Sequence, residues 1–146
     1  MTPTIQTGEL YLVFPLERLF RQPQRDDIVY FRPPPHPDTT RISLLGITYQ
    51  PITVKRIVAL QGDVLSYQGG QRFIDNTHTP DPLASETALV NNIALNIPQI
   101  QLASNEVYVL GDNRFPLQSV DSRHFGAIKL GRIQGRLRVR LWPLSF

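Results

Sequence analysis

The 146-residue sequence has no cysteine, one tryptophan and, among its 15 basic residues, only two lysines. Without cysteine, the chain has no disulfide, no thiolate metal site and no cysteine nucleophile. No run approaches the roughly 18 apolar residues of a membrane-spanning helix, and the first residues lack the basic and apolar regions of a signal peptide. The apolar content of 41% excludes a disordered tail. The printed chain is therefore expected to be soluble by itself.

The length of the chain favours a single domain over residues 1–146. Its 13 prolines and 9 glycines separate short runs of β-forming residues. Strands are predicted at 9–14, 28–31, 42–49, 52–60, 64–67, 72–74, 107–110 and from 133 onward. The polar segment 76–105 is expected to be a surface excursion with one short helix near 85–90. The expected fold class is mostly β, with coiled antiparallel sheets or an open barrel and little helix.

The scarcity of lysine directs attention to Lys55, which lies in the predicted strand 52–60. Both faces of this strand are largely apolar, so Lys55 is expected to project from a buried strand. Two interpretations are open: a lysine on an edge strand that discourages aggregation, and a general base. A base must be neutral when it acts, whereas free lysine titrates at about 10.4. Burial against apolar neighbours is the effect that lowers such a pKa.

A second group of polar residues occupies positions 111–126, after a predicted strand. The simplest interpretation is a solvated loop in which Asp121 and Arg123 form a weak surface ion pair. A catalytic triad of Ser119, Asp121 and His124 is a further interpretation, but three residues of one loop rarely adopt the required geometry.

Charge and histidine content test two other classes of function. The isoelectric point is near 9.6, and arginines line one face of the last predicted strand. Aromatic residues do not alternate with these arginines, and eight of the 13 arginines lie dispersed before Arg123, so no nucleic-acid partner is expected. His36 and His78 lack the spacing of metal ligands, so neither a metal nor another cofactor is expected. A self-cleaving repressor would need an Ala-Gly cleavage site, which the sequence lacks.

Three segments carry a recognisable pattern. Residues 1–9 contain MTPTI and then Gly-Glu, residues 54–63 read VKRIVALQGD, and residues 111–126 contain GDNR and SVDSR-x-FG. In this order, and over nearly the whole chain, they resemble type I signal peptidases, the serine/lysine endopeptidases that remove signal peptides from exported proteins. A lone Gly-Asp-Asn would be a weak signal, whereas the combination is specific. The fold that this resemblance implies is also mostly β.

The resemblance implies a role for each matching residue. Lys55 would be the general base, and Ser119 would hydrogen-bond its ammonium nitrogen. The residues implied to support the site are Gly111, Asp112, Asp121, Ser122 and Arg123. Those implied to flank an extended peptide substrate are Met1, Pro3, Ile52 and Val54. The implied substrates are preproteins with small residues before the cut, of the Ala-x-Ala type.

One departure from the family pattern bears on activity. The nucleophilic serine of the family aligns immediately before Met1, and neither that serine nor the preceding membrane anchor is in the printed sequence. We therefore expect a signal-peptidase-like serine endopeptidase in a truncated or catalytically incomplete form. The alternatives are a non-catalytic homologue that binds signal peptides, and a soluble maturation peptidase for a client such as nickel superoxide dismutase. The family location is the membrane, with the catalytic domain on the periplasmic or lumenal face, and the basic last strand is a candidate contact with anionic lipid.

Overall fold

The computed structural model describes residues 1, 4–14, 21–37, 39, 42–45, 47–83, 94–115 and 118–142. These residues form a mostly β fold with little helix, which confirms the predicted fold class. The strands are β1 (Leu10–Val13), β2 (Ile28–Phe31), β3 (Ile42–Leu44), β4 (Ile47–Tyr49), β5 (Thr53–Ala59), β6 (Val64–Gln68), β7 (Gln71–Ile74), β8 (Thr77–His78), β9 (Ile97–Gln101), β10 (Glu106–Leu110), β11 (Ile128–Lys129) and β12 (Ile133–Trp142). The helical turns are α2 (Ser122–Phe125) and η2 (Leu130–Arg132).

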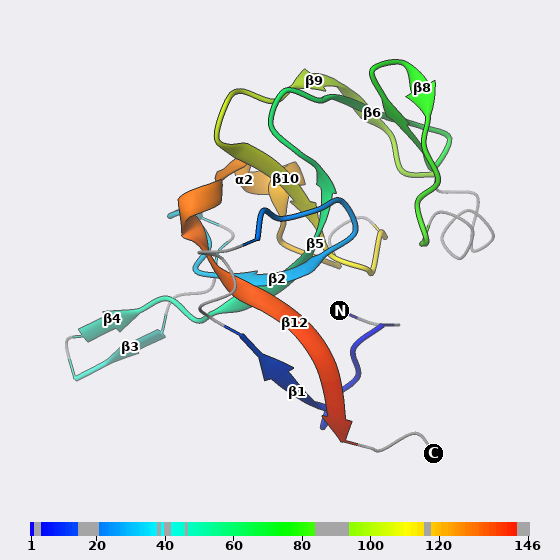
Figure 1. Ribbon diagram of the computed structural model, residues 1–146. Coiled ribbons are helices and arrows are strands. Elements are labelled where there is room, and N and C mark those ends of the chain that lie inside the picture. The colour runs from blue at the N-terminus through cyan, green and yellow to red at the C-terminus, as the bar shows by residue number, and fades with distance from the viewer. Residues whose placement is uncertain are drawn as a thin grey trace.

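The largest sheet has six strands in the order β1-β12-β2-β5-β10-β11. All of its neighbouring pairs are antiparallel. The long strand β12 crosses the molecule and carries β1 at its far end (Figure 1). Strand β5 lies in the interior of the sheet, between β2 and β10. The interpretation of Lys55 as an edge-strand residue is therefore wrong.

A second sheet has four strands in the order β8-β7-β6-β9. Strands β8 and β9 come from segment 76–105, which was expected to be a surface excursion. Proline at position 98 argues against a strand, but β9 is an edge strand, where the missing amide proton is tolerated. Ile97 and Leu102 are buried in the core. The helix expected near 85–90 lies outside the described residues.

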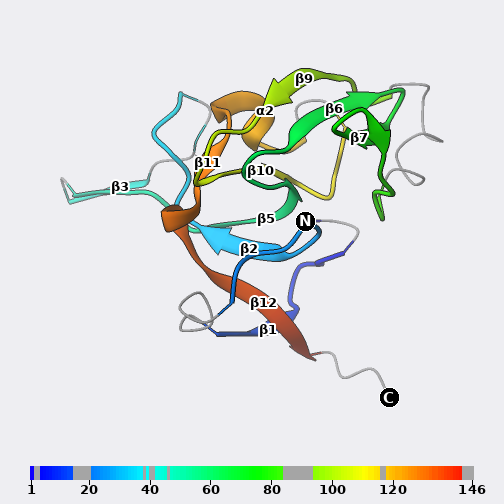
Figure 2. The same cartoon turned by 45° about the horizontal axis from the view of Figure 1, so that its top comes forward.

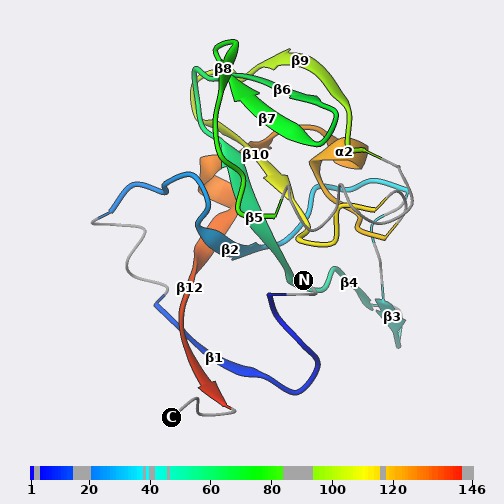
Figure 3. The same ribbon diagram turned by 90° about the vertical axis from the view of Figure 1, so that its right-hand side faces the viewer.

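The single strand predicted over 42–49 is wrong, because this segment forms the hairpin β3–β4. Leu44 pairs with Ile47, and Leu45 in the turn has a positive φ of 49°. In the sequence, a glycine interrupts the apolar run 42–49, and this turn signal was overlooked. The hairpin projects from the side of the molecule (Figure 3), and Leu45 is 95% exposed.

Both faces of the large sheet are buried where β5 and β10 pair. The neighbouring residues Ile57 and Val58 of β5 belong to different apolar clusters: Val58 packs with Tyr67 and Leu110, whereas Ile57 packs with Val29. The four-stranded sheet lies on one side of β5 and β10, as Figure 2 shows. Burial on both faces explains why the end of β5 reads as a continuous apolar run.

Candidate active site

Lys55 lies at the start of β5, just beyond the end of β10. Strand β10 ends at Leu110, which pairs with Arg56, and Lys55 pairs with Val29 on the other side. The Nζ atom of Lys55 donates a hydrogen bond to Ser119 Oγ at 2.9 Å. Two candidate site residues that are 64 positions apart in the sequence are thus brought together.

The surroundings of Lys55 favour its neutral form. Burial lowers the pKa of Lys55, and the positive charge of Arg123 lowers it further, while Asp121 and Asp112 act in the opposite direction. Among the described residues, Lys55 has a hydroxyl partner and no ion pair with a carboxylate. A lysine in this environment is neutral, and therefore available as a base, at a lower pH than a free lysine is.

Asp121 is the centre of the loop that presents Ser119. It is completely buried and accepts hydrogen bonds from the Gly111 amide at 2.9 Å and from Arg123 Nε and Nη2 at 2.9 and 2.8 Å. Burial alone would raise the pKa of Asp121, but Arg123 and the Gly111 amide lower it. The interpretation of Asp121 and Arg123 as a surface pair is wrong. Ser122 is also buried, and its Oγ accepts from the Val109 amide at 3.0 Å.

Gly111 forms the wall behind this contact. A Cβ at this position would lie 2.1 Å from Ser119 Oγ and 2.7 Å from Ser119 Cβ. Any side chain would push Ser119 away, so the close approach requires glycine. The approach brings the 111 peptide against the same serine that accepts the hydrogen bond from Lys55.

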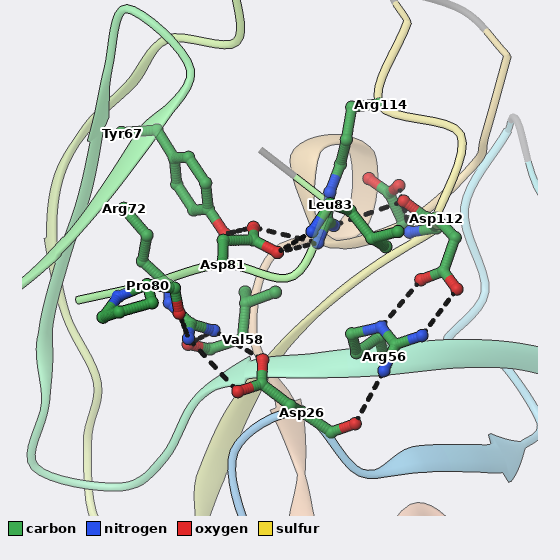
Figure 4. Close-up of polar contacts among 12 residues, drawn as sticks. Asp26, Arg56, Val58, Tyr67, Arg72, Pro80, Asp81, Leu83, Asp112 and Arg114 are labelled. Atoms are coloured by element: carbon green, nitrogen blue, oxygen red, sulfur yellow. Dashed lines mark hydrogen bonds and ion pairs between the residues drawn. The ribbon is translucent and has the colours of Figure 1, made fainter. Parts of the chain in front are cut away.

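Arg56 connects the start of the chain to the loop after β10. Its Nε and Nη2 donate to the Asp112 carboxylate at 2.9 and 2.8 Å, and Nη2 also lies 3.3 Å from Thr4 Oγ1. Figure 4 shows the paired contacts with Asp112, and a further one to the Asp26 carbonyl. Burial and the positive charge of Lys55 lower the pKa of the Met1 amino group. The beginning of the printed chain therefore lies near Lys55.

A cavity of about 320 Å³ opens beside Lys55 and Ser119. Ile52, one of the residues implied to flank substrate, lines this cavity, while Val54 lies with Arg56 on the face of β5 opposite to Lys55. Pro3 lies outside the described residues. The other lining residues are Thr53, which lies between Ile52 and Val54, and Pro33, Thr39, Pro51, Gln118 and Val120. Sequence reasoning gave the last five no role, because three of them lie outside the recognised segments and the side chains of Gln118 and Val120 carry no charge.

The triad interpretation is not supported by the geometry of the loop. The hydroxyl of Ser119 accepts from Lys55, and the buried Nδ1 atom of His124 has no hydrogen-bond partner among the residues that the structure describes. His124 instead donates its backbone amide to the Asp121 carbonyl at 2.8 Å, in the first turn of α2. In the described part of the chain, no group of three or more histidine, aspartate or glutamate side chains could hold a metal ion.

Comparison with known proteins identifies the family. The family described as "Signal peptidase, peptidase S26" matches residues 1–142. The chain belongs to the peptidase S26 signal peptidase family. It is 30% identical over 149 residues to thylakoidal processing peptidase 1 of Arabidopsis thaliana chloroplasts, covering 99% of this chain and 40% of that protein. It is 28% identical over 154 residues to signal peptidase I of Bacillus caldolyticus, covering 99% of this chain and 76% of that protein.

A solved structure gives the same assignment. The crystal structure of a signal peptidase I from Enterococcus faecalis V583 matches with a TM-score of 0.61 and 26% identity, over 81% of this chain and 98% of that one. Signal peptidases I are membrane-associated serine endopeptidases that act on preprotein signal peptides. This chain spans 40% and 36% of the lengths of the two thylakoidal peptidases that it matches. None of the helices in the described residues is both long and apolar enough to cross a membrane.

Proposed function

We propose that this protein is a signal-peptidase-like serine endopeptidase that removes N-terminal signal peptides from exported preproteins by a Ser/Lys dyad. The observation that carries the proposal is the contact of 2.9 Å between Lys55 Nζ and Ser119 Oγ, at a lysine whose pKa is lowered by burial. A neutral amine held by a hydroxyl is suited to general-base catalysis, whereas an ammonium fixed by a carboxylate is not.

The nucleophile of this dyad is the serine that aligns immediately before Met1. The electrostatic effect of Lys55 on the Met1 amino group supports this position, because that amino group occupies the place of the peptide bond to the preceding residue. Arg56 supports it as well, since it contacts Thr4 in the same segment. The proposed reaction requires that serine, because Lys55 supplies a base and not a nucleophile.

The reaction follows from these groups. Neutral Lys55 accepts the proton of the serine hydroxyl while the serine oxygen attacks the carbonyl carbon of the scissile bond. The tetrahedral intermediate then collapses to an acyl-enzyme, and the leaving amine takes the proton from the Lys55 ammonium. Lys55 next accepts a proton from water, whose oxygen attacks the carbonyl carbon of the acyl-enzyme. The bond from this carbon to the serine oxygen then breaks, the Lys55 ammonium returns the proton to the serine oxygen, and the signal peptide is released.

Ser119 holds the amine of Lys55 at the reacting position, and the surrounding residues fix Ser119. The supporting residues in this proposal are Gly111, Asp112, Asp121, Ser122 and Arg123. Their contacts described above are short and largely buried, so the loop is held from the backbone amide of 111 to helix α2.

The substrate is proposed to bind as an extended strand along the first residues of β5. Strand β10 pairs with β5 only as far as Arg56, so in the described part of the chain the edge of 53–55 on that side is open to a peptide. Ile52, Val54, Met1 and Pro3 are proposed to flank it. The adjoining cavity of about 320 Å³ suits the small residues that precede the cut.

The proposed location is the membrane, with this domain on the periplasmic or lumenal face. The arginines of β12 are proposed to contact anionic lipid rather than nucleic acid. Arg138 and Arg140 belong to this strand, and Arg140 forms an exposed ion pair of 3.0 Å with Glu9.

The proposal is tested by placing one residue before Met1. Two fusions with the same upstream leader carry either serine or alanine at that position, and both are incubated with a preprotein-like Ala-x-Ala peptide. The serine form is expected to cut the peptide, and the alanine form is expected to be inactive. The proposal fails if the serine form carrying Lys55→Ala cuts as fast as the form with Lys55.

The same fusions separate the alternatives. A serine form that binds the signal peptide without cutting it would favour the non-catalytic homologue. A serine form that cuts the N-terminal segment of a nickel superoxide dismutase precursor but no Ala-x-Ala peptide would favour the client-specific maturation peptidase.

A further inference from the structure

Arg114 completes the Gly-Asp-Asn-Arg segment but is not used in the reaction proposed above. Its side chain is 2% exposed and reaches in two directions. Nη1 donates to the Gly111 carbonyl at 3.2 Å, and Nη2 donates to the two Asp81 carboxylate oxygens at 3.1 and 3.3 Å. Arg114 thus joins the wall of the candidate active site to Asp81, which lies in the chain between strands β8 and β9 of the four-stranded sheet.

Asp81 is held from the side of the four-stranded sheet. Its side chain is fully buried, and it accepts a hydrogen bond of 2.6 Å from the hydroxyl of Tyr67 on β6. The Leu83 amide donates a further bond of 3.1 Å. Figure 4 shows Tyr67, Asp81 and Arg114 meeting in one cluster, which we call the Asp81 network.

The Asp81 network ends on the peptide that contacts Ser119. The Gly111 carbonyl accepts from Arg114, and the Gly111 amide donates to Asp121, so this residue is held on both sides. Arg123 also donates to the Arg114 carbonyl at 2.9 Å. Because Gly111 packs directly against Ser119 Oγ, any displacement of Gly111 is passed to the serine that holds Lys55.

The network consists of charges that are costly to bury. Burial alone would raise the pKa of Asp81, but Arg114 and the hydrogen bond from Tyr67 lower it, so the pair is ionised. Apolar residues of similar volume often stabilise a protein as well as a buried ion pair does. A role in fixing the geometry of the site explains why this ion pair is buried here, whereas a gain in stability does not.

We propose that Asp81 and Arg114 are positioning residues that hold Gly111 against Ser119 and thereby fix the Lys55–Ser119 contact from the four-stranded sheet. This inference rests on the proposed function only where it assigns Lys55 the part of the base. When the network is broken, Gly111 and Ser119 move, water reaches Lys55, and the pKa of Lys55 rises toward that of a free lysine. The residues of the network do not line the substrate cavity, so kcat is expected to fall while KM stays unchanged.

The composition of the chain allows a direct test without catalysis. There are two lysines, so a protein labelled with ¹³C at lysine Cε gives two side-chain signals, assigned with Lys129→Arg. The titration of Lys55 is followed by NMR in the full chain and in Asp81→Asn, Arg114→Met and the double variant. Lys129 provides an internal reference in each sample.

A matched control is offered by the ion pair of Arg136 with Asp27. It is also largely buried, with an N–O distance of 2.6 Å, but it joins β12 to the segment before β2. Asp27→Asn therefore removes a mostly buried carboxylate, 18% exposed against 0% for Asp81, without touching Gly111. It is expected to lower the melting temperature and to leave the titration of Lys55 in place.

The proposal is supported if both single variants shift the Lys55 titration upward and the double variant shifts it no further, since residues acting as one unit are not additive. It is overturned if the variants lose thermal stability, as Asp27→Asn does, while Lys55 titrates as in the parent chain. If either variant does not fold, Tyr67→Phe is used instead, because it removes only one hydrogen bond of the network. An upward shift of the Lys55 titration in Tyr67→Phe then supports the proposal, and a loss of thermal stability with an unchanged titration overturns it.

Activity then separates this inference from the proposed function. In the serine-bearing fusion, Asp81→Asn is expected to lower kcat by roughly tenfold, in the range of coupling measured within such networks. A shifted Lys55 titration in a fusion that cuts no peptide would defeat the proposed function and leave the positioning role standing. Unchanged titration and unchanged kcat in an active fusion would defeat the positioning role alone.

Discussion

The two lysines of this chain lie on the two strands that pair with β10, yet their surroundings differ. Lys55 is on the interior strand β5, partly buried, with a serine hydroxyl as its hydrogen-bond partner. Lys129 is on the edge strand β11, 59% exposed, with the Glu106 carboxylate 3.0 Å away. The hydrogen bond from Lys129 lowers the pKa of Glu106 and so stabilises the ionised carboxylate. The surroundings of Lys55, by contrast, favour the neutral form of its amine.

The largest difference between the two lysines is expected in catalysis. In the serine-bearing fusion, Lys55→Met should reduce kcat/KM by about 10²–10⁴-fold, the usual contribution of a general base. Lys129→Met should change it by less than about twofold, as most exposed substitutions do. Equal losses in the two variants, measured by peptide cleavage, would remove the distinction between the two sites.

The pH dependence of the stability of Lys55→Met tests whether Lys55 carries a charge that is costly to bury. Burial lowers the pKa of Lys55 below its ordinary value of 10.5, so the unfolded chain binds this proton more tightly than the folded chain. The parent protein must therefore gain stability as the pH rises from the lowered pKa towards 10.5. The advantage of Lys55→Met in urea unfolding should be largest below the lowered pKa and should shrink across this interval. A difference that does not vary with pH would contradict the burial of the charge.

Glycines near the two lysines provide the next test. Gly111→Ala places a methyl group 2.1 Å from Ser119 Oγ, and a misplacement of about 1 Å commonly costs roughly 10²-fold in activity. It should also destabilise the fold by about 1–3 kcal/mol through overpacking. Gly131→Ala, in η2 beside Lys129, meets no atom of the described residues within 4 Å and should leave activity unchanged. Cleavage assays and denaturant unfolding of both variants show whether the packing around Gly111, near Lys55, is tighter than the packing around Gly131, near Lys129.

Ser119→Ala removes the partner of Lys55 without adding volume. The charged form of Lys55 loses a hydrogen bond, so the pKa of Lys55 should fall further, in the direction opposite to the shift expected for the Asp81 variants. Loss of one bond to a charged group should lower kcat by roughly tenfold or more. NMR titration of the two lysines measures the pKa, and an upward shift would show that Ser119 excludes water rather than binding the amine.

The sequence singled out Lys55 and Ser119 as candidate site residues because both lie in short segments with a strong pattern. Lys55 lies in the 54–63 segment, and Ser119 lies in the 111–126 segment. The mostly β class also followed, since proline and glycine separated β-forming runs. The position of β5 within the sheet could not be predicted from the sequence. An apolar strand has the same sequence pattern at the edge of a sheet and in its interior, so its neighbouring strands must be known first. The hairpin β3–β4 and strand β9 were missed for local reasons, one glycine and one proline in unexpected places.

The Asp81 network shows what sequence reasoning could not supply. Tyr67, Asp81 and Arg114 are up to 47 positions apart, and only Arg114 belongs to a recognised segment. Asp81 precedes a polar stretch and has the local appearance of a surface residue. Its burial arises because the four-stranded sheet folds over β5 and β10, a tertiary arrangement with no short-range signal.

The smallest effect is expected at the exposed ion pair, where Lys129→Gln removes the charge that faces Glu106. Exposed pairs contribute little because water screens them and the side chains lose freedom when they pair. The melting temperature should therefore change little, and the change should vanish at high salt, since salt screens exposed charges. The same measurement on Lys55→Gln should show a change in melting temperature that persists at high salt. The reason is that burial, rather than an exposed ion pair, determines how Lys55 contributes to stability. If salt abolishes both differences alike, Lys55 is as accessible to solvent as Lys129, and its role as a buried neutral base is untenable.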